Sequence, residues 1–528
     1  MASEVMKGVF PEANRLEHFT FMGASEKYPE KGLESATVVG RTGYTGEDGF
    51  EFVVPNKYAV GLWREILSNP LVKPIGLGAR DTLRMEKGFL LSGQDFNEDR
   101  NPIEAGVSWI IGGTLLETYV NNEFVRIRES VSRKLEITEL VKRHGKKPIL
   151  LEDLGGKKAV LNLWADRERI YRELKMTRDQ FLLNYESSLS ENVNLKEGEK
   201  LFKSKADMKD VPVCWHYPGD AGYYITSGIF VAERNGKRNL SIHRVFVESE
   251  RGGYARLVPR DLLRMYNDAV SHGEEMKVSI VIGSPLEFLL ASATSVPFEQ
   301  DESMIAASLF RKSKGKEMEF SRSKFGLLVP SNSDYVINAI LTGKAKKEGP
   351  FKDVTGTYDI QNDQPQILFD SVECVKDPIY HALVPATMEH FNLMGLPREP
   401  TIFKEIRGEG VNVKDVRLSE GGASWLHGIV KIKKTSKDDF AKTVEASFRG
   451  HKSMKRVIVV DEDIDIYRDE DVEWALATRF QADKGLLIKK ERGSSLDPSS
   501  GEDFITAKMG MDATMPIGGG RKFVREVS

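Results

Sequence analysis

The chain has 528 residues, too many for one hydrophobic core, so its length predicts three or more domains. Charged residues make up 29% of the sequence and the net charge is −3, which gives no electrostatic basis for binding nucleic acid or an anionic membrane. Two cysteines, Cys214 and Cys374, are too few for a disulfide scaffold or a cysteine metal knuckle, and they fit a reducing compartment. No run of about 18 apolar residues occurs, so we expect a soluble, cytoplasmic protein.

The first 110 residues combine glycine turns with short regular elements. A glycine-punctuated turn at 41–51 leads into a strand at 50–54, and residues 58–67 have helical spacing of apolar side chains. A second glycine turn at 76–78 precedes another helix. These elements predict an α+β module.

Three segments of this module resemble the aminomethyltransferase (T-protein) family of the glycine cleavage system: RTGYTGEDGFE at 41–51, PIGLGARDTLRMEKG at 74–88 and the stretch 102–109. In that family the positions of Glu47 and Arg80 face the folate. The resemblance covers only about the middle third of such an enzyme and lacks the section with its catalytic aspartate. We therefore interpret residues 1–113 as a truncated module without transferase activity, and a residual folate site is the alternative.

The pattern changes after residue 114. Residues 115–120 are an amphipathic start, and apolar spacing predicts helices at 135–141 and 166–174 and a strand at 159–162. This alternation indicates a small α/β lobe that ends in a polar linker near 196–209.

The sequence is β-rich from about 210 to 399. Asn235-Gly236 stands between two apolar runs, which is the strongest short signal for a hairpin. A nearly continuous apolar strand is predicted at 278–282 and a helix at 286–291.

Beyond residue 400 the pattern is α/β again. A buried strand is predicted at 456–460, a helix at 470–480 and a strand at 485–489. The whole chain is therefore expected to be an α/β multidomain protein with a β-rich middle.

Two carboxylates, Glu348 and Asp353, flank a Gly-Pro turn that restrains the backbone. The following β-branched and aromatic run, 354–358, predicts a strand. A rigid turn that leads into a strand can present both carboxylates to one side of a cleft, where each changes the proton affinity of the other. On these residues alone, an ordinary acidic turn in water is the alternative.

Eight ordered segments resemble the UbiD family of decarboxylases: ITSG at 225–228, NLSIHR at 239–244, VSIVIG at 278–283, EGPFKDVTG at 348–356, LPREP at 396–400, VIVVDEDIDI at 457–466, SSLDPSS at 494–500 and KMGMDAT at 508–514. The resemblance implies a UbiD-type α/β N-terminal lobe at 114–209 and a flavin-binding split barrel at 210–399. It also implies a C-terminal α/β and oligomerisation domain at 400–528, and hence a homo-oligomer.

The resemblance further implies a prenylated FMN cofactor, supplied by a flavin prenyltransferase. A divalent cation, Mn²⁺ or Mg²⁺, would bind with it, and K⁺ is a further candidate. In this family the modified flavin provides an electron sink for loss of CO₂ from a small α,β-unsaturated carboxylic acid. The protein orients the substrate, protonates it and excludes water.

Carried over by position, the family's catalytic residues fall on Arg244, Glu348 and Asp353. Arg244 would hold the substrate carboxylate and pair with Glu348, because a guanidinium offers a bidentate fork to carboxylates. Asp353 would protonate the carbon that loses CO₂.

The family's metal ligands, an asparagine, a histidine and a glutamate, fall on Asn239, Asp261 and Glu302. An aspartate thus stands where a histidine is usual. Carboxylate oxygen suits a hard cation, so Asp261 is expected to be a ligand. The alternative is that Asp261 only begins a helix as its N-cap.

The positions expected to contact the cofactor are Thr226, Asn239, Ser241, Arg244, Arg260 and Arg449. The family's phosphate-facing lysine near 446–452 cannot be placed from the sequence. Arg449 and Lys452 are the candidates for that position.

Within the family, SEGGASWLHG at 419–428 and EGPFKDVTGTYDI at 348–360 resemble the archaeal branch. That branch is associated with decarboxylation of trans-anhydromevalonate 5-phosphate to isopentenyl phosphate in a modified mevalonate pathway. The alternative within the enzyme class is an aromatic or polyprenyl-hydroxybenzoate decarboxylase. A non-catalytic flavin-binding or assembly protein is the alternative from another class, and the intact Arg244, Glu348 and Asp353 argue against it.

Overall fold

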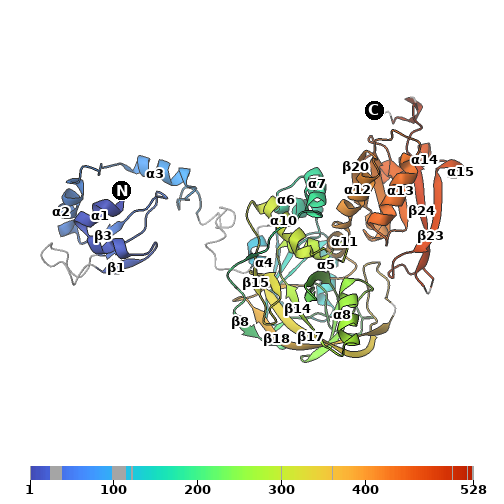
Figure 1. The fold of residues 1–528 in the computed structure, drawn as a ribbon, viewed down its shortest axis with the longest axis horizontal. Coiled ribbons are helices and arrows are strands. Elements are labelled where there is room, and N and C mark those ends of the chain that lie inside the picture. The colour runs from blue at the N-terminus through green and yellow to red at the C-terminus, as the bar shows by residue number, and fades with distance from the viewer. Residues whose placement is uncertain are drawn as a thin grey trace. The chain divides into compact units, whose positions relative to one another are not determined.

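The computed structural model describes residues 2–23, 38–97, 115–120, 123–298, 300–359, 361–501, 503–519 and 521–525. The chain divides into two compact units, Met1–Gly112 and Gly113–Ser528, which are described separately (Figure 1). The segment 102–109 and the predicted boundary at 113 lie outside the described residues. The finer boundaries at 209 and 399 stay predictions.

The described part of the first unit is an antiparallel sheet in the order β1-β2-β3 with the helices α1, α2 and α3. Its elements are α1 (Ala2–Val9), β1 (Phe21–Gly23), β2 (Val38–Gly40), β3 (Glu51–Val53), α2 (Asn56–Leu67) and α3 (Leu77–Glu86). Among its described residues, the buried core consists of Met6, Val9, Phe10, Ala13 and Val39. Helix α2 has no buried residue, and the indole of Trp63 is 54% exposed. Among the described residues of this unit, few apolar side chains are buried, so they contribute little apolar burial to its stability.

The second unit begins with the predicted α/β lobe. Its helices are α4 (Leu115–Tyr119), α5 (Glu136–His144), α6 (Arg167–Leu174) and α7 (Arg178–Ser188). Its strands are β4 (Val125–Val131), β5 (Ile149–Leu154), β6 (Ala159–Leu161) and β19 (Tyr380–His381), in the order β19-β6-β5-β4. The two predicted helices and the predicted strand are confirmed, and the amphipathic stretch at 115–120 contains the helix α4.

A nine-stranded antiparallel sheet forms the centre of the unit. Its main path is β11-β10-β14-β17-β18-β13-β12-β9, and β8 pairs with β18. The strands are β8 (Ser204–Ala206), β9 (Tyr224–Ile225), β10 (Ile229–Arg234), β11 (Lys237–Ile242), β12 (Val245–Ser249), β13 (Gly252–Ala255), β14 (Met276–Ile282), β17 (Tyr335–Glu348) and β18 (Asn362–Cys374). A separate small sheet has the order β16-β15-β7. Its strands are β7 (Lys196–Glu197), β15 (Glu319–Arg322) and β16 (Leu328–Pro330).

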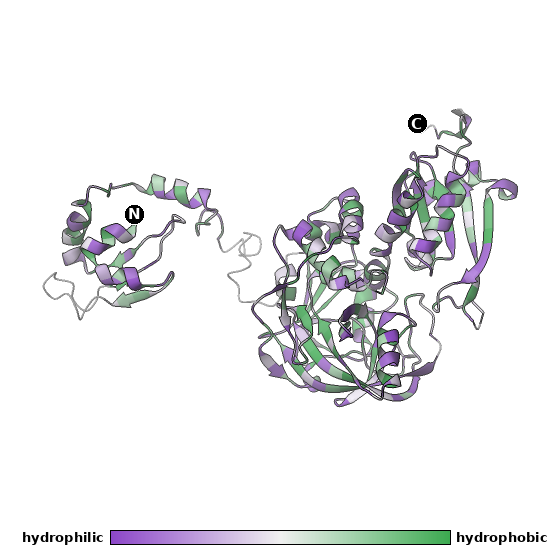
Figure 2. Ribbon diagram, in the orientation of Figure 1, coloured by the Kyte–Doolittle hydropathy of each residue, from purple (hydrophilic) through white to green (hydrophobic). Residues whose placement is uncertain are grey.

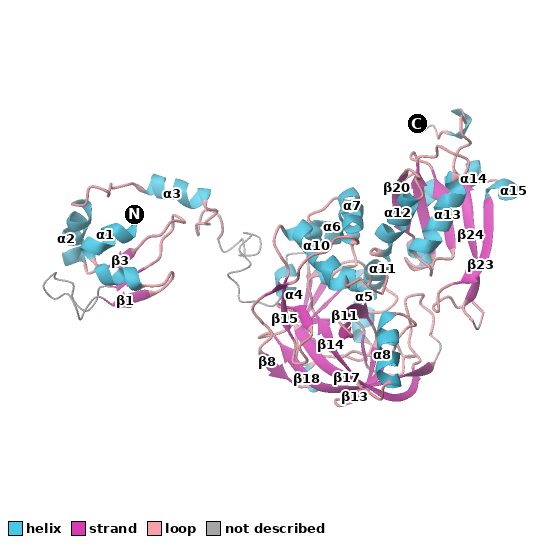
Figure 3. Ribbon diagram, viewed as in Figure 1, coloured by secondary structure: helices cyan, strands magenta, loops and turns pink. Residues whose placement is uncertain are grey.

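The central sheet is curled and buried on both faces. Register shifts between β17 and β18 near Asn338 and Leu341 bend these long strands, and Figure 3 shows the bend. Consecutive residues of β10, Ile229 and Phe230, point to opposite faces and belong to two different apolar clusters. The strands of this sheet are accordingly rich in hydrophobic residues, drawn green in Figure 2.

Helices cover this sheet, namely α8 (Asp261–Ser271), α9 (Leu286–Ser292), α10 (Glu302–Lys314) and α11 (Met388–Gly395). The predicted hairpin is confirmed, because β10 and β11 are joined by Asn235 and Gly236, both with positive φ.

The C-terminal region is a mixed sheet in the order β20-β21-β22-β24-β23. Its elements are α12 (Arg398–Gly408), β20 (Val413–Leu418), β21 (His427–Ile432), α13 (Asp439–Gly450), β22 (Arg456–Val460), α14 (Asp469–Arg479), α15 (Ala482–Gly485), β23 (Leu486–Arg492) and β24 (Ile505–Ala513). Val457 packs with α12 and α13, whereas Ile458 packs with α14. The predicted buried strand is therefore confirmed, as is the α/β organisation around a β-rich middle.

The predicted strand at 354–358 is wrong. Residues 354–357 form a turn, closed by a hydrogen bond of 2.9 Å from the Gly356 N–H to the Asp353 carbonyl. Lys352 and Tyr358, on either side of this turn, form an isolated antiparallel β-bridge. No helix among the described residues is long and apolar enough to span a membrane.

Candidate functional site

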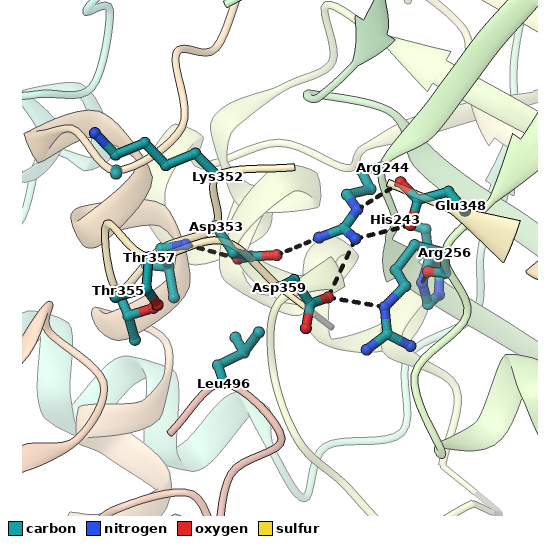
Figure 4. A network of polar contacts seen from close by, with 12 residues as sticks. His243, Arg244, Arg256, Glu348, Lys352, Asp353, Thr355, Thr357, Asp359 and Leu496 are labelled. Atoms are coloured by element: carbon teal, nitrogen blue, oxygen red, sulfur yellow. Dashed lines mark hydrogen bonds and ion pairs between the residues drawn. The ribbon is translucent and has the colours of Figure 1, made fainter. Parts of the chain in front are cut away.

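Arg244 lies at the centre of a buried polar network. It stands in the short link between β11 and β12, and Glu348 is the last residue of β17. Arg244 Nε and Nη2 donate to Glu348 Oε1 and Oε2 at 3.0 and 2.8 Å. Two parallel N–H···O bonds are the bidentate arrangement that guanidinium and carboxylate favour. The predicted pairing of these two residues is therefore present (Figure 4).

The same guanidinium contacts two aspartates of the loop between β17 and β18. Arg244 Nη1 donates to Asp353 Oδ2 at 2.7 Å, and Nη2 lies 3.1 Å from Asp359 Oδ2. Asp359 also accepts a hydrogen bond of 3.0 Å from Arg256 Nε, so it bridges two arginines (Figure 4). Three carboxylates thus surround Arg244.

The network is largely shielded from water. The side chains of Arg244 and Glu348 are 6% and 1% exposed. The Phe351 ring lies 4.5 Å from the Arg244 guanidinium carbon and also packs on Tyr224. Burial opposes the charge, but the surrounding carboxylates, Glu348 first, raise the pKa of Arg244 above its ordinary value. Arg244 is therefore a permanent cation in a site that is shielded from water.

Asp220 anchors the loop that carries Asp353. Its carboxylate accepts backbone hydrogen bonds from Lys352 at 2.9 Å and from Tyr217 at 3.0 Å. The backbone N–H of Asp353 donates to the Thr357 carbonyl at 3.0 Å. Burial raises the pKa of Asp220, and the two N–H donors oppose that rise. These bonds fix the direction in which Asp353 faces Arg244.

The predicted metal ligands come from three elements. Asn239 Nδ2 donates to Glu302 Oε1 at 3.1 Å, and the Leu240 N–H donates to Glu302 Oε2 at 3.0 Å. Burial raises the pKa of Glu302 to about 8, and the nearby charges of Asp301 and Asp261 add to the rise. Asn239, Glu302 and Asp261 are therefore brought into one neighbourhood.

Asp261 is the first residue of α8, and Arg260 occupies the N-cap position without a side-chain cap. A carboxylate in the first turn still complements the helix dipole. Counting only His, Cys, Asp and Glu, the described residues contain no group of three that could hold a metal ion. A metal site here would therefore need the amide oxygen of Asn239 as a third ligand.

A chain of polar contacts joins the metal candidates to the Arg244 network. Ser241 Oγ lies 2.9 Å from Asn239 Oδ1 and 2.9 Å from His243 Nε2. His243 Nδ1 donates to the Arg256 carbonyl at 2.9 Å. Burial lowers the pKa of His243 to about 4, so this histidine is neutral near pH 7.

The remaining predicted cofactor residues are in different surroundings. The Thr226 hydroxyl is buried and donates to a backbone carbonyl at 2.6 Å, whereas Arg260 is exposed. Arg449 is half-exposed and pairs with Glu405 and Glu409 at the C-terminal end of α12. The structure thus places Arg449 on an outer ion-pair cluster.

Arg398, at the opposite end of α12, is buried at 4% exposure. Helix α12 has 11 residues, so its ends are about 15 Å apart. Within the described part of the chain, Arg398 Nε and Nη1 have no hydrogen-bond partner. Burial lowers the pKa of Arg398, the charge of Arg260 lowers it further, and Glu302 opposes this. A buried guanidinium with unpaired donors fits an anion as its missing partner.

Sequence reasoning missed Arg398, Asp359, Arg256 and Asp220 as site residues. Arg398 and Asp359 lie inside segments that carry the family resemblance, and this position could have identified them as candidate site residues. Arg256 and Asp220 lie outside those segments, and only the tertiary contacts identify them.

In the first unit, the two positions expected to face folate do not pair with each other. Glu47 Oε1 lies 3.2 Å from Lys87 Nζ, and the Arg80 guanidinium lies 4.9 Å from the Tyr44 ring. Both side chains are exposed. No enclosed site between Glu47 and Arg80 follows from these contacts.

Comparison with protein-family models identifies both parts of the chain. Domain models of 3-octaprenyl-4-hydroxybenzoate carboxy-lyase (UbiD) match residues 120–187 (N-terminal), 188–388 (Rift-related) and 391–513 (C-terminal). The GCVT N-terminal domain model matches residues 1–114.

Curated relatives match most of the chain. The anhydromevalonate phosphate decarboxylase of Methanocaldococcus jannaschii is 37% identical over 407 residues, which is 75% of this chain and 95% of the relative. That of Archaeoglobus fulgidus is 40% identical over 380 residues, 70% of this chain and 86% of the relative.

Solved structures have the same fold. The UbiD-class enzyme HmfF from Pelotomaculum thermopropionicum in complex with FMN is 29% identical, with a TM-score of 0.72 over 77% of this chain and 94% of that chain. An evolved dimeric form of HmfF in complex with prFMN has a TM-score of 0.70 and is 27% identical, over 77% of this chain and 96% of that chain. Both predicted resemblances are confirmed, and the chain belongs to the UbiD family of carboxy-lyases.

Proposed function

We propose that this protein is a prenylated-FMN-dependent decarboxylase that converts trans-anhydromevalonate 5-phosphate to isopentenyl phosphate. The observation that carries the proposal is the buried network of Arg244, Glu348 and Asp353, in which one cation faces two acids. The relatives named anhydromevalonate phosphate decarboxylase support the choice of substrate, because they are similar over nearly their whole length.

The residues present fit a flavin phosphate and a divalent cation. The unpaired donors of the buried Arg398, with Arg260 nearby, would hold the phosphate. Asn239, Asp261 and Glu302 supply hard oxygen ligands for Mn²⁺ or Mg²⁺ beside it. K⁺ is a further candidate for the same region. When bound, the prenylated flavin supplies the electron sink for loss of CO₂.

The chain's own residues would orient and protonate the substrate. Arg244 would bind the substrate carboxylate, and Glu348 would hold the guanidinium in place through two hydrogen bonds. Asp353 would carry the proton that is delivered to the carbon after CO₂ leaves. Phe351 and Tyr224 would keep water away from this step.

We also propose that the protein receives its cofactor from a flavin prenyltransferase, acts in the cytoplasm and forms a homo-oligomer through its C-terminal lobe. The edge strand β23 and its neighbour β24 expose Ile488 and Ile505 at 64% and 40%. Apolar side chains at an open sheet edge favour association.

The test is co-expression with a flavin prenyltransferase, followed by an absorption spectrum, the cofactor mass and turnover assays. We expect prenylated FMN and turnover of trans-anhydromevalonate 5-phosphate, with isopentenyl phosphate detected by mass spectrometry. Turnover of a cinnamate-type acid alone would keep the chemistry and overturn the substrate. Unmodified flavin, or no flavin, would favour a non-catalytic protein.

A further inference from the structure

Arg256 follows β13 and is built into the network around Arg244. Its Nε donates to Asp359 Oδ2 at 3.0 Å, and its backbone N–H donates to the Arg244 carbonyl at 3.0 Å. Its carbonyl accepts the hydrogen bond from His243. The side chain is 11% exposed. Three hydrogen bonds therefore hold Arg256 in place, while part of its side chain stays accessible to solvent.

The two terminal nitrogens of Arg256 make no hydrogen bond within the described part of the chain, since Nε provides its one side-chain bond. Figure 4 shows these nitrogens pointing away from the Arg244–Glu348 pair. Asp359 Oδ2 serves both guanidinium groups, so Arg256 lacks a full counter-charge of its own. A planar fork with two unused donors matches an oxyanion such as phosphate.

We propose that Arg256 binds the phosphate of the substrate while Arg244 binds its carboxylate, an inference that rests on the proposed function. Arg244 Nη2 and Arg256 Nε lie within about 6 Å of each other, because they bind the same oxygen at 3.1 and 3.0 Å. One small molecule with an anionic group at each end can therefore contact both arginines. Asp359 acts as the positioning residue that fixes their separation.

Arg398 is the competing anion site, but its neighbours differ. It lies close to Arg260 and to the metal candidate Glu302, which assigns it to the cofactor. Arg256 instead shares Asp359 with Arg244, which assigns it to the substrate. Substrate specificity for a phosphorylated acid is therefore located in Arg256.

The experiment compares kcat/KM for trans-anhydromevalonate 5-phosphate and for the same acid without its phosphate, in flavin-loaded enzyme. In Arg256→Met we expect the preference for the phosphorylated acid to fall by about 10- to 100-fold, as for loss of charge-assisted hydrogen bonds. Arg256→Lys keeps the positive charge but not the planar pair of donors, so its preference for the phosphorylated acid should lie between that of Arg256→Met and that of the wild type. Arg251→Met, an exposed arginine of the preceding β12–β13 turn, is the matched control.

An unchanged preference in Arg256→Met would overturn the assignment, as would loss of flavin, which would place Arg256 at the cofactor. If the wild type turned over neither acid, the proposed function would fail separately. Calorimetric titration with isopentenyl phosphate would then decide the role of Arg256. Weaker binding by Arg256→Met than by Arg251→Met would support it, and equal binding would overturn it.

Discussion

At the scale of single residues, Arg244 is the centre of the polar network of the site. A buried guanidinium is costly unless carboxylates compensate its charge, and here Glu348, Asp353 and Asp359 do so. The arrangement places the carboxyl group of Asp353 directly beside the buried cation of Arg244, so the proposed proton donor and the proposed carboxylate-binding group are neighbours.

Replacing Glu348 by Gln should lower turnover by more than replacing Asp353 by Asn. The amide cannot balance the buried charge of Arg244, so both the geometry and the carboxylate site are lost. The double variant should be only slightly worse than Glu348→Gln, because groups that act as a unit are not additive. Steady-state kinetics of flavin-loaded enzyme measures this, with Glu248→Gln on the exposed side of β12 as control. If the losses of turnover in the two single variants added fully in the double variant, Glu348 and Asp353 would act independently.

Asp261→Ala should reduce bound divalent metal and bound flavin together, because a cation that bridges a cofactor phosphate couples the two binding events. Asp261→His, which restores the commoner family ligand, should retain both. Metal analysis and the flavin absorbance of purified protein measure this. Asp268→Ala, an exposed aspartate of the same helix, is the control. Unchanged metal and flavin in Asp261→Ala would remove Asp261 from the metal site.

At the scale of elements, the loop between β17 and β18 does most to build the site. The β-branched residues at 354–358 predict a strand, but Gly356 with a φ of +77° and the hydrogen bond to Asp353 close a turn instead. Local propensity could predict the β10–β11 hairpin and the amphipathic helices. It could not predict the strand order of the central sheet, because those pairings join residues far apart in sequence.

Asp220→Ala should destabilise this loop. Two backbone N–H groups, of Lys352 and Tyr217, would lose their acceptor, at a cost of about 1–3 kcal/mol each if they stay buried. We expect a lower melting temperature and reduced turnover with flavin still bound, and a milder effect in Asp220→Asn, which keeps one acceptor oxygen. Thermal unfolding and kinetics measure both. Full stability and turnover in Asp220→Ala would show that the loop is fixed in some other way.

At the scale of the whole molecule, the chain consists of two units with different relatives. The GCVT model matches the first unit, and the UbiD models begin at residue 120. The sequence motifs were sufficient to predict both resemblances and the triad of Arg244, Glu348 and Asp353. They were not sufficient to place Arg449 and Arg398, because both are basic residues and only burial and pairing distinguish them.

Deletion of residues 1–113 should leave decarboxylation intact, because every residue assigned to the site lies in the second unit. Turnover and flavin content of the shortened chain measure this against the full chain. Titration of the full chain with tetrahydrofolate should show no saturable binding. A shortened chain that retains flavin but loses turnover would assign a role to the first unit.

The most direct test of the catalytic assignment is the rate at which flavin-loaded Asp353→Asn forms isopentenyl phosphate from trans-anhydromevalonate 5-phosphate. The asparagine keeps the size of the side chain but has no proton to deliver, so turnover should fall by roughly 10²- to 10⁴-fold with flavin content unchanged. Near-normal turnover by Asp353→Asn would contradict the account and remove Asp353 from the mechanism.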